Sequence, residues 1–445
     1  MKYSSAIVVA AASVANAGYC SDAYDEGGNY FCPGAVKQIK YSGLDIAGKY
    51  RAVATMDNSG TCTYEDKDYS GPIAPFDEDL TMHFRGPLQL AQVAVYTPSS
   101  SSSKRDAPKP HSKRHGHQHQ HLHKKHHEHV HAEKRGDIVS AVIDGVLETW
   151  ENNYFGPSTA TTDASATTTA AAATTTAADS TTKTASSATS TSTDYIDVGD
   201  YSRIAYYNAK DQTADGIVFL GNYGDPSLSG TWDTVWGSSL AYANEDGSGA
   251  AASPTILKDG TLADTSEVII ASDQECNDDC GTVRPGSVAY KGFSGSDKVF
   301  LAEFQMPMSS ESGDGLNMPA YWLLNAAIPR TGQYSSCSCW KGDNASPQEG
   351  GCGEADIIEI LASGDTKAKS TFHFAAGTGD SHYFDRPTDS TMKVAVVFQA
   401  SSSTASIKVL DDDFDFSTSL TSDQVEDLVS DESDTSLFSL MSFAL

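Results

Sequence analysis

The sequence predicts an all-β protein whose strands pack as a β-sandwich. From residue 195 onward, short runs rich in β-branched and aromatic residues alternate with turns of Gly, Asp and Ser, and helical periodicity is scarce. That texture is typical of two packed sheets. One short helix is expected at residues 421–430. The expected strands are residues 216–220, 267–271, 299–306, 321–324, 355–361, 370–374, 393–399 and 406–410, with a last strand at 437–445.

The N-terminal part, residues 18–98, is a second β-rich module. Strand-like residues occupy 50–56 and 80–84, and residues 88–96 have the apolar, β-branched character of a buried strand. Residues 1–17 before it carry a positive start, a short apolar run and a small-x-small cleavage site, which together predict a secretion signal. The apolar run is too short to cross a bilayer, so we expect a secreted protein without a membrane anchor.

A polar connection of three pieces joins the two β-rich parts. Residues 99–135 hold ten of the thirteen histidines and three Lys-Arg pairs, the dibasic pairs that kexin-like proteases cut. We interpret this piece as a disordered spacer, with metal binding as the alternative. Residues 136–156 are a short amphipathic segment, where the spacing of apolar residues over 136–152 predicts a helix. Residues 157–194 are almost entirely Ser, Thr and Ala, which predicts an O-glycosylated linker.

The cysteines predict a covalent link between the two β-rich parts. The chain has eight cysteines, and an even number in a secreted protein favours disulfides. Three of them precede the connection and five follow it. If all eight pair, at least one bridge must join the N-terminal module to the C-terminal domain.

The charge balance argues against nucleic acid as a partner. Lys and Arg total 30 whereas Asp and Glu total 59, which gives a net charge of −29. Nucleic-acid-binding domains carry a basic surface instead. The composition fits an extracellular protein that acts on a neutral polymer, and it leaves the oligomeric state open.

The sharpest feature of the sequence is a cluster of three carboxylates within six residues. Glu354, Asp356 and Glu359 are separated only by Ala and Ile. Side chains alternate along a strand, so Glu354 and Asp356 share a face while Glu359 would point to the opposite one. A β-bulge between Asp356 and Glu359 brings all three to one side. A calcium site or a plain solvated strand is the alternative, although a calcium loop has a different ligand spacing.

This spacing suits the hydrolysis of a glycosidic bond. The backbone gap between the two glutamates is about 13 Å on a bulged strand, and converging side chains can reach the about 5–5.5 Å that retaining hydrolases use. Glu354 would act as nucleophile and Glu359 as acid and then base. Clustered carboxylates repel each other, so at least one pKa should be raised, as a general acid requires. These groups suffice for the chemistry, so neither a cofactor nor a metal is implied.

The motif resembles the active-site signature of glycoside hydrolase family 16, whose members are β-jelly-roll enzymes with a concave cleft. Two further segments follow the order of that family. Residues 318–324, Met-Pro-Ala-Tyr-Trp-Leu-Leu, are similar to its Trp-Pro-Ala-aromatic-Trp-Leu strand, with Met318 in place of the Trp. Residues 371–374, Thr-Phe-His-Phe, fall where the family has a strand that carries a histidine. The resemblance implies a jelly-roll catalytic domain over residues 195–445.

The whole chain resembles a narrower group, the fungal cell-wall proteins described as probable circularly permuted 1,3-β-glucanases. A Cys-bearing N-terminal module, a Ser/Thr linker and the segments 206–209 and 237–242 belong to this resemblance. It implies that N-terminal strands complete the sandwich, that the protein resides in the cell wall, and that the substrate is 1,3-linked glucan. Sugar-binding side chains are then expected near the motif. Our candidates are Trp322, Tyr321, His373 and Trp340.

Three functions share this site. The first is a secreted, endo-acting β-1,3-glucanase that hydrolyses wall glucan. The second is a transglycosylase, in which a sugar hydroxyl instead of water takes the glycosyl group from the enzyme. The third is a glucan-binding wall protein without catalysis, which would not need all three carboxylates.

Overall fold

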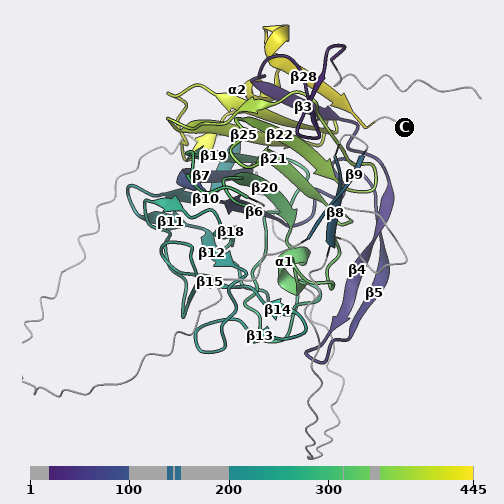
Figure 1. The fold of residues 1–445 in the computed structure, drawn as a ribbon, viewed down its shortest axis with the longest axis vertical. Helices are drawn as coiled ribbons and strands as arrows, with labels where there is room; N and C mark the ends of the chain where they lie inside the picture. The colour runs from purple at the N-terminus through teal and green to yellow at the C-terminus, as the bar shows by residue number, and fades with distance from the viewer. Residues whose placement is uncertain are drawn as a thin grey trace, which may run out of the picture.

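The described strands form two large sheets that pack face to face (Figure 1). The computed structural model describes residues 20–99, 200–313, 315–340 and 351–443, together with the backbone of residues 138–143 and 146–151. The predicted signal peptide, the histidine-rich tract and the Ser/Thr linker lie outside these residues. Within them, no helix is long and apolar enough to cross a bilayer.

We call the sheet that contains the carboxylate motif the site sheet and the other the back sheet. The site sheet has the order β16 (Ala250–Ala251), β15 (Ala241–Ala243), β12 (Ile217–Gly221), β18 (Glu267–Ser272), β6 (Leu80–Arg85), β20 (Ala320–Asn325), β21 (Glu354–Ile360), β22 (Lys367–His373) and β23 (Thr378–Gly379), with β24 (Phe384–Asp385) also on β22. The back sheet has the order β11 (Thr213–Asp215), β10 (Tyr201–Asn208), β7 (Leu88–Pro98), β19 (Lys298–Gln305), β25 (Met392–Gln399), β26 (Thr404–Leu410), β3 (Gln38–Ser42) and β28 (Phe438–Ser442), with β17 (Thr261–Leu262) on β7 and β27 (Ser419–Leu420) on β10.

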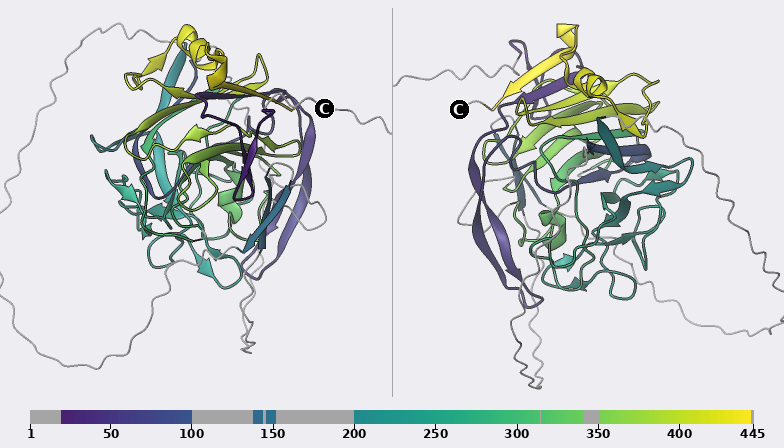
Figure 2. Two further views of the ribbon diagram at one scale, coloured as in Figure 1. Left: turned by 45° about the horizontal axis from the view of Figure 1, so that its top comes forward. Right: turned by 180° about the vertical axis from the view of Figure 1, so that it is seen from behind.

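Smaller elements complete the described part. Two-stranded ribbons pair β1 (Tyr24–Glu26) with β2 (Asn29–Phe31), β4 (Gly48–Met56) with β5 (Cys62–Tyr69), β8 (Ile138–Ile143) with β9 (Val146–Glu151), and β13 (Trp232–Asp233) with β14 (Gly237–Ser238). The helices are α1 (Ala327–Thr331), α2 (Ser422–Val429) and a 3₁₀ turn at Thr435–Leu437. The β4–β5 ribbon runs along the side of the sandwich (Figure 2). The strands predicted from the sequence are confirmed, with ends shifted by a few residues.

N-terminal strands lie in the interior of both sheets. In the site sheet, β6 lies between β18 and β20, and in the back sheet β7 lies between β10 and β19. β3 lies between β26 and β28 and runs parallel to β28. The prediction that the N-terminal module completes the sandwich is therefore confirmed. Neither part of the chain supplies a whole sheet by itself.

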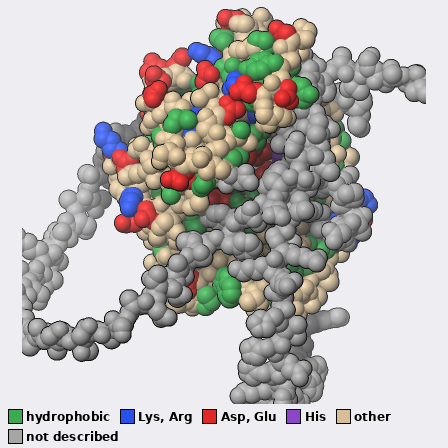
Figure 3. Space-filling model, in the orientation of Figure 1, with side chains coloured by type: hydrophobic (Ala, Val, Ile, Leu, Met, Phe, Trp, Pro, Cys, Tyr) green, Lys and Arg blue, Asp and Glu red, His purple; other side chains and the backbone are tan. Residues whose placement is uncertain are grey.

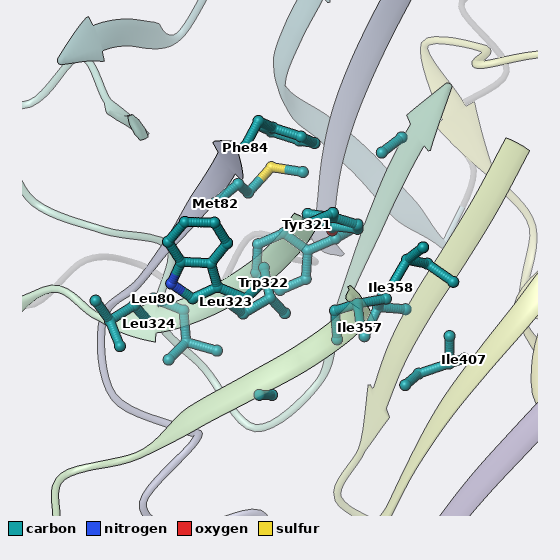
Figure 4. Close-up of a cluster of buried hydrophobic side chains, with 14 of the residues drawn as sticks. Leu80, Met82, Phe84, Tyr321, Trp322, Leu323, Leu324, Ile357, Ile358 and Ile407 are labelled. Atoms are coloured by element: carbon teal, nitrogen blue, oxygen red, sulfur yellow. The ribbon is translucent and has the colours of Figure 1, made fainter. Parts of the chain in front are cut away.

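The core between the sheets is built from alternate residues of these strands. Figure 4 shows Leu80, Met82 and Phe84 of β6 beside Tyr321 and Leu323 of β20. All five side chains are fully buried. Because side chains alternate along a strand, the intervening residues of β6 and β20 must face away from this core.

The predicted helix at 421–430 is confirmed as α2, and its start has a local cause. The Thr421 hydroxyl accepts from the Gln424 backbone NH, while the Gln424 side chain accepts from the Thr421 NH, which forms a capping box. Val425, Leu428 and Val429 pack against the outer side of the back sheet. This helix therefore covers the outer side of the back sheet.

The helix predicted over residues 136–152 is wrong. The structure pairs β8 with β9 as an antiparallel ribbon, in the register Ile143 to Val146 and Ile138 to Glu151. The two strands are rich in β-branched residues, and Asp144-Gly145 between them is a dipeptide typical of two-residue hairpins. The helical spacing of the apolar residues was therefore the weaker signal.

The disulfide prediction is confirmed. All eight cysteines lie in the described ranges, and none of them is free. The bond between Cys62 and Cys337 joins the N-terminal module to the C-terminal domain. The other three bonds are Cys20–Cys32, Cys276–Cys280 and Cys339–Cys352.

We predict unequal stability losses when these bonds are removed. The Cys62–Cys337 bond spans 275 positions, whereas Cys276–Cys280 spans 4. In the loop-entropy model, a bond that closes the longer loop restricts the unfolded chain more. The Cys62→Ser/Cys337→Ser variant should therefore lose roughly 4 kcal/mol more than the Cys276→Ser/Cys280→Ser control. Equilibrium denaturation measures both losses, and equal losses would contradict the expectation.

Candidate active site

The bulge predicted between Asp356 and Glu359 is present in β21. Its register with β22 shifts between Asp356 and Glu359. On the other side, Tyr321 pairs with Ile358 whereas Trp322 pairs with Asp356, so Ile357 is the extra residue. The bulge keeps the apolar residues inside. Ala355, Ile357, Ile358 and Ile360 are all fully buried in the core.

The three carboxylates consequently lie on the side of the site sheet that faces away from the core. We call this side the site face. The Glu359 side chain is 22% exposed and the Asp356 side chain is 8% exposed. The trio is therefore neither split between two faces nor sealed from solvent. In Figure 3, acidic side chains and a histidine side chain are visible close together near the centre of the view.

Neighbouring strands add a row of side chains on each side of the carboxylates. On β22, His373 is opposite Glu354, Thr371 is opposite Asp356, and Lys369 is opposite Glu359. On β20, Trp322 is opposite Asp356. One strand further, His83 of β6 is opposite Trp322. These positions share the site face because directly opposed residues of antiparallel strands point to the same side.

Each carboxylate has its own hydrogen-bond partner. Trp340 donates from its indole Nε1 to Glu354 Oε2. His373 Nε2 lies 2.9 Å from Asp356 Oδ2. Arg85 Nη2 lies 3.4 Å from Glu359 Oε1. Each member of the trio is thus oriented separately, and the partner of Asp356 is a histidine.

Burial and mutual repulsion raise the pKa of both glutamates. Burial raises the pKa of Glu354 to about 8, and the charges of Asp356 and Glu359 add to this against the opposing effects of His373 and Trp340. Burial likewise raises the pKa of Glu359 to about 7, with Asp356 adding to the effect and Arg85 opposing it. Near neutral pH, the glutamate pair therefore retains a proton. A shared proton of this kind is what acid–base catalysis by a carboxylate pair requires.

His373 supplies a positive charge next to the trio. Burial alone would lower its pKa, but the hydrogen bond and charge of Asp356, together with the charges of Glu354 and Glu359, raise the pKa to about 9. The imidazolium therefore pairs with Asp356 at neutral pH. It also lies beside the Trp340 ring, with centroids 6.3 Å apart.

Two disulfides fix the loop that carries Trp340. Cys339, its direct neighbour, is bonded to Cys352, which lies two residues before Glu354. Cys337 is bonded to Cys62 of β5, and the Tyr64 hydroxyl of the same strand donates to the Ser336 carbonyl at 2.8 Å. The indole that binds Glu354 is thus held from both the C-terminal domain and the N-terminal ribbon.

Of the predicted sugar-binding residues, Trp322, Trp340 and His373 lie on the site face beside the carboxylates, and Tyr321 does not. The prediction for Tyr321 is wrong. Its side chain is 0% exposed and stacks on Phe84 with centroids 4.8 Å apart. Adjacent residues on a strand point to opposite faces, so the strand that presents Trp322 to the site must turn Tyr321 into the core.

The sequence reasoning missed three residues of the site face. Arg85 and His83 belong to β6, and Glu267 begins β18. The Arg85 guanidinium lies 5.9 Å from the Trp322 ring centre, and its Nε donates to the Met318 carbonyl at 2.9 Å. The alternation of residues 80–85, with polar side chains at every second position, marks a strand with one polar face. This alternation could have identified His83 and Arg85 as residues on the polar face of a strand. No local feature of the sequence shows which strands pair with β6.

Comparisons with known proteins agree with this division of the site. A model of the C-terminal part of the cell wall protein family YJL171C/Tos1 matches residues 199–428, and a model of the N-terminal part matches residues 37–98. The chain belongs to this family. Arg85 and His83 fall in the N-terminal match, whereas the three carboxylates fall in the C-terminal match. The site face therefore combines both parts of the family.

Several curated relatives span nearly the whole chain. One from Arthroderma benhamiae, named "Probable circularly permuted 1,3-beta-glucanase", is 36% identical over 97% of this chain and 98% of its own length. Relatives named "Probable circularly permuted 1,3-beta-glucanase TOS1" are 39% identical over 89% of this chain in Saccharomyces cerevisiae and 38% identical over 96% in Candida albicans. They cover 90% and 97% of those two proteins. No solved structure gives a significant match.

Proposed function

We propose that this protein is a secreted, cell-wall β-1,3-glucanase that cuts within glucan chains by a retaining mechanism with two glutamates. The observation that carries the proposal is the bulge of β21, which places Glu354, Asp356 and Glu359 together on the site face. The linkage of the substrate is taken from the names of the relatives, which describe them as probable 1,3-β-glucanases.

The proposed reaction has two steps. In the first, the Glu354 carboxylate attacks the anomeric carbon while Glu359 gives its proton to the departing glycosidic oxygen, which leaves a covalent glycosyl-enzyme. In the second, Glu359 removes a proton from a water molecule whose oxygen attacks the same carbon and releases Glu354. Trp340 orients Glu354, and Arg85 orients Glu359. Asp356 raises the pKa of both glutamates, and the neighbouring His373 opposes this effect.

The stereochemistry of the product tests this mechanism. Two displacements at one carbon retain the β configuration, so NMR should show the β anomer of the new reducing end before mutarotation. A first product with the α configuration would exclude the covalent intermediate. Adding a labelled glucan oligosaccharide as acceptor separates hydrolysis from transfer. Label in lengthened chains would favour the transglycosylase, whereas label left in the free acceptor favours the hydrolase.

Activity should depend on pH with a fall on both sides. The reactive form carries one proton on the pair, held by Glu359. Because burial and the charge of Asp356 raise the pKa of both glutamates, at lower pH the pair carries two protons and no nucleophile is charged. At higher pH both are ionised and no acid remains. Replacing Arg85 with Gln removes a cation that lowers the pKa of Glu359, so the alkaline fall should move up by about one pH unit.

The matched control for this prediction is Arg203→Gln. The Arg203 guanidinium lies over the ring of Tyr206 in the back sheet, with 3.9 Å to the ring centre. That replacement removes the same charge but leaves the site face unchanged, and the pH profile should stay in place. A downward shift for Arg85→Gln, or equal shifts for both variants, would contradict the assigned role of Arg85.

A further inference from the structure

One exposed aromatic side chain of the site face is anchored by a buried pair of hydrogen-bonded side chains, Glu267 and His83. Tyr334 follows α1 on the loop that leads to Trp340, and it is 43% exposed. Its hydroxyl donates to Glu267 Oε2. Glu267 is only 6% exposed and also accepts a hydrogen bond from Gln333 Nε2 at 2.9 Å. The ring is thus presented to solvent while its hydroxyl is fixed below.

The anchor continues into the floor of the active site. Glu267 Oε1 lies 3.0 Å from Nδ1 of the fully buried His83. Burial lowers the pKa of His83, so the neutral ring donates from Nδ1 to Glu267. The same ring packs against Trp322, with centroids 4.9 Å apart. Trp322 is directly opposite Asp356 on the neighbouring strand, so Glu267, His83 and Trp322 link Tyr334 to the strand that carries the carboxylates.

The sheet register gives the distance between the anchor and the catalytic pair. Glu267 is opposite Arg85, Arg85 is opposite Ala320, and Ala320 is opposite Glu359. Neighbouring strands are about 4.8 Å apart, so the backbones of Glu267 and Glu359 are about 14 Å apart on one face. A short oligosaccharide that lies across the strands can span that distance.

We propose that Tyr334 is the platform of an outer subsite that binds one glucosyl unit of a β-glucan chain. His83 and Glu267 are positioning residues that fix the angle of the ring. A tyrosine with a tied hydroxyl offers a rigid apolar face at little entropic cost, which is the property of a pre-organised binding surface. Beside it, Asn222 Nδ2 donates to Gln333 Oε1 at 3.0 Å, which places two amide groups next to the platform. The nature of the ligand rests on the proposed function.

A purely structural role for Tyr334 makes a different prediction. If the tyrosine only satisfies the buried Glu267 carboxylate, then removing the hydroxyl is the damaging change and removing the ring adds little. If the ring binds sugar, Tyr334→Phe keeps most of the affinity and Tyr334→Ala loses it. The two variants therefore separate the roles.

Binding is best measured in the Glu354→Gln background, where turnover cannot consume the ligand. The probes are the disaccharide and the hexasaccharide of β-1,3-linked glucose, titrated by calorimetry. We expect Tyr334→Ala to weaken hexasaccharide binding roughly tenfold and to reduce its advantage over the disaccharide. Tyr334→Phe should stay within about threefold of the parent. Glu267→Gln should fall between them, since the ring remains but loses its charged anchor.

Trp232→Ala is the matched control. Trp232 is 55% exposed on β13, and the same loss of a large exposed ring there should leave hexasaccharide binding unchanged. Thermal unfolding of each variant shows that the fold is retained. If hexasaccharide binding survives Tyr334→Ala, or if Trp232→Ala weakens it equally, the proposed subsite is wrong but the proposed function still stands. If the Glu354→Gln parent itself does not bind the hexasaccharide, both the subsite and the proposed function are wrong.

Discussion

Replacing Glu354 or Glu359 with glutamine should lower the turnover of β-1,3-glucan by at least about 10²–10⁴-fold, which is the range that proton transfer by a positioned group contributes. The fold should survive, because glutamine has nearly the same shape.

Both glutamates have a pKa raised by burial and by Asp356, so their charged forms destabilise the native state. A neutral amide removes that cost. Each variant should therefore unfold at a higher temperature than the wild type above neutral pH, where the wild-type carboxylates ionise.

Chemical rescue distinguishes the roles of the two glutamates. In Glu359→Ala, azide should restore activity by attacking the glycosyl-enzyme, and the product should be a β-glycosyl azide. In Glu354→Ala, azide should attack the substrate directly and form the α-glycosyl azide. The opposite stereochemistry at the two positions would reverse the roles. The Glu303→Gln variant is the control, because Glu303 lies on β19 of the back sheet and its loss should not change turnover.

A chain that begins at residue 195 should fail to fold, although it contains all three carboxylates. Without the N-terminal module, the site sheet loses β6 from between β18 and β20, and the back sheet loses β7 from between β10 and β19. Each gap leaves two strand edges unpaired. It also exposes core residues such as Tyr321, whose ring stacks on Phe84 of the missing β6. The loss exceeds the about 5–15 kcal/mol by which a domain is stable. We expect an insoluble product without a cooperative unfolding transition.

Complementation and an internal deletion complete this experiment. Co-expression of residues 18–99 with residues 195–445 should restore solubility, a cooperative transition and turnover, because the two pieces contain the described strands of both sheets. The full chain without residues 111–131 serves as the control, and it should keep its unfolding temperature and activity. A soluble, active 195–445 fragment would show that the N-terminal strands are dispensable.

Much of the site followed from local rules. The alternation of side chains, broken by one extra residue, was enough to predict a bulge between Asp356 and Glu359 and the shared face of Glu354, Asp356 and Glu359. The count of cysteines on each side of the connection was enough to predict a bond such as Cys62–Cys337. Both inferences concern neighbours in sequence or simple arithmetic, so they do not depend on how distant strands meet.

Tertiary structure decided which side of each strand became the site and which distant residues completed it. On β20, alternation required Tyr321 and Trp322 to face opposite ways, but only packing against Phe84 showed that Tyr321 is the buried one. Arg85 and Glu359 are 274 positions apart, and their contact exists because β6 and β21 both flank β20. Strand pairing is chosen by the burial of whole faces, which is a non-local quantity. A short sequence window therefore determines which residues can share a face, and only the assembled sheets determine which of them do.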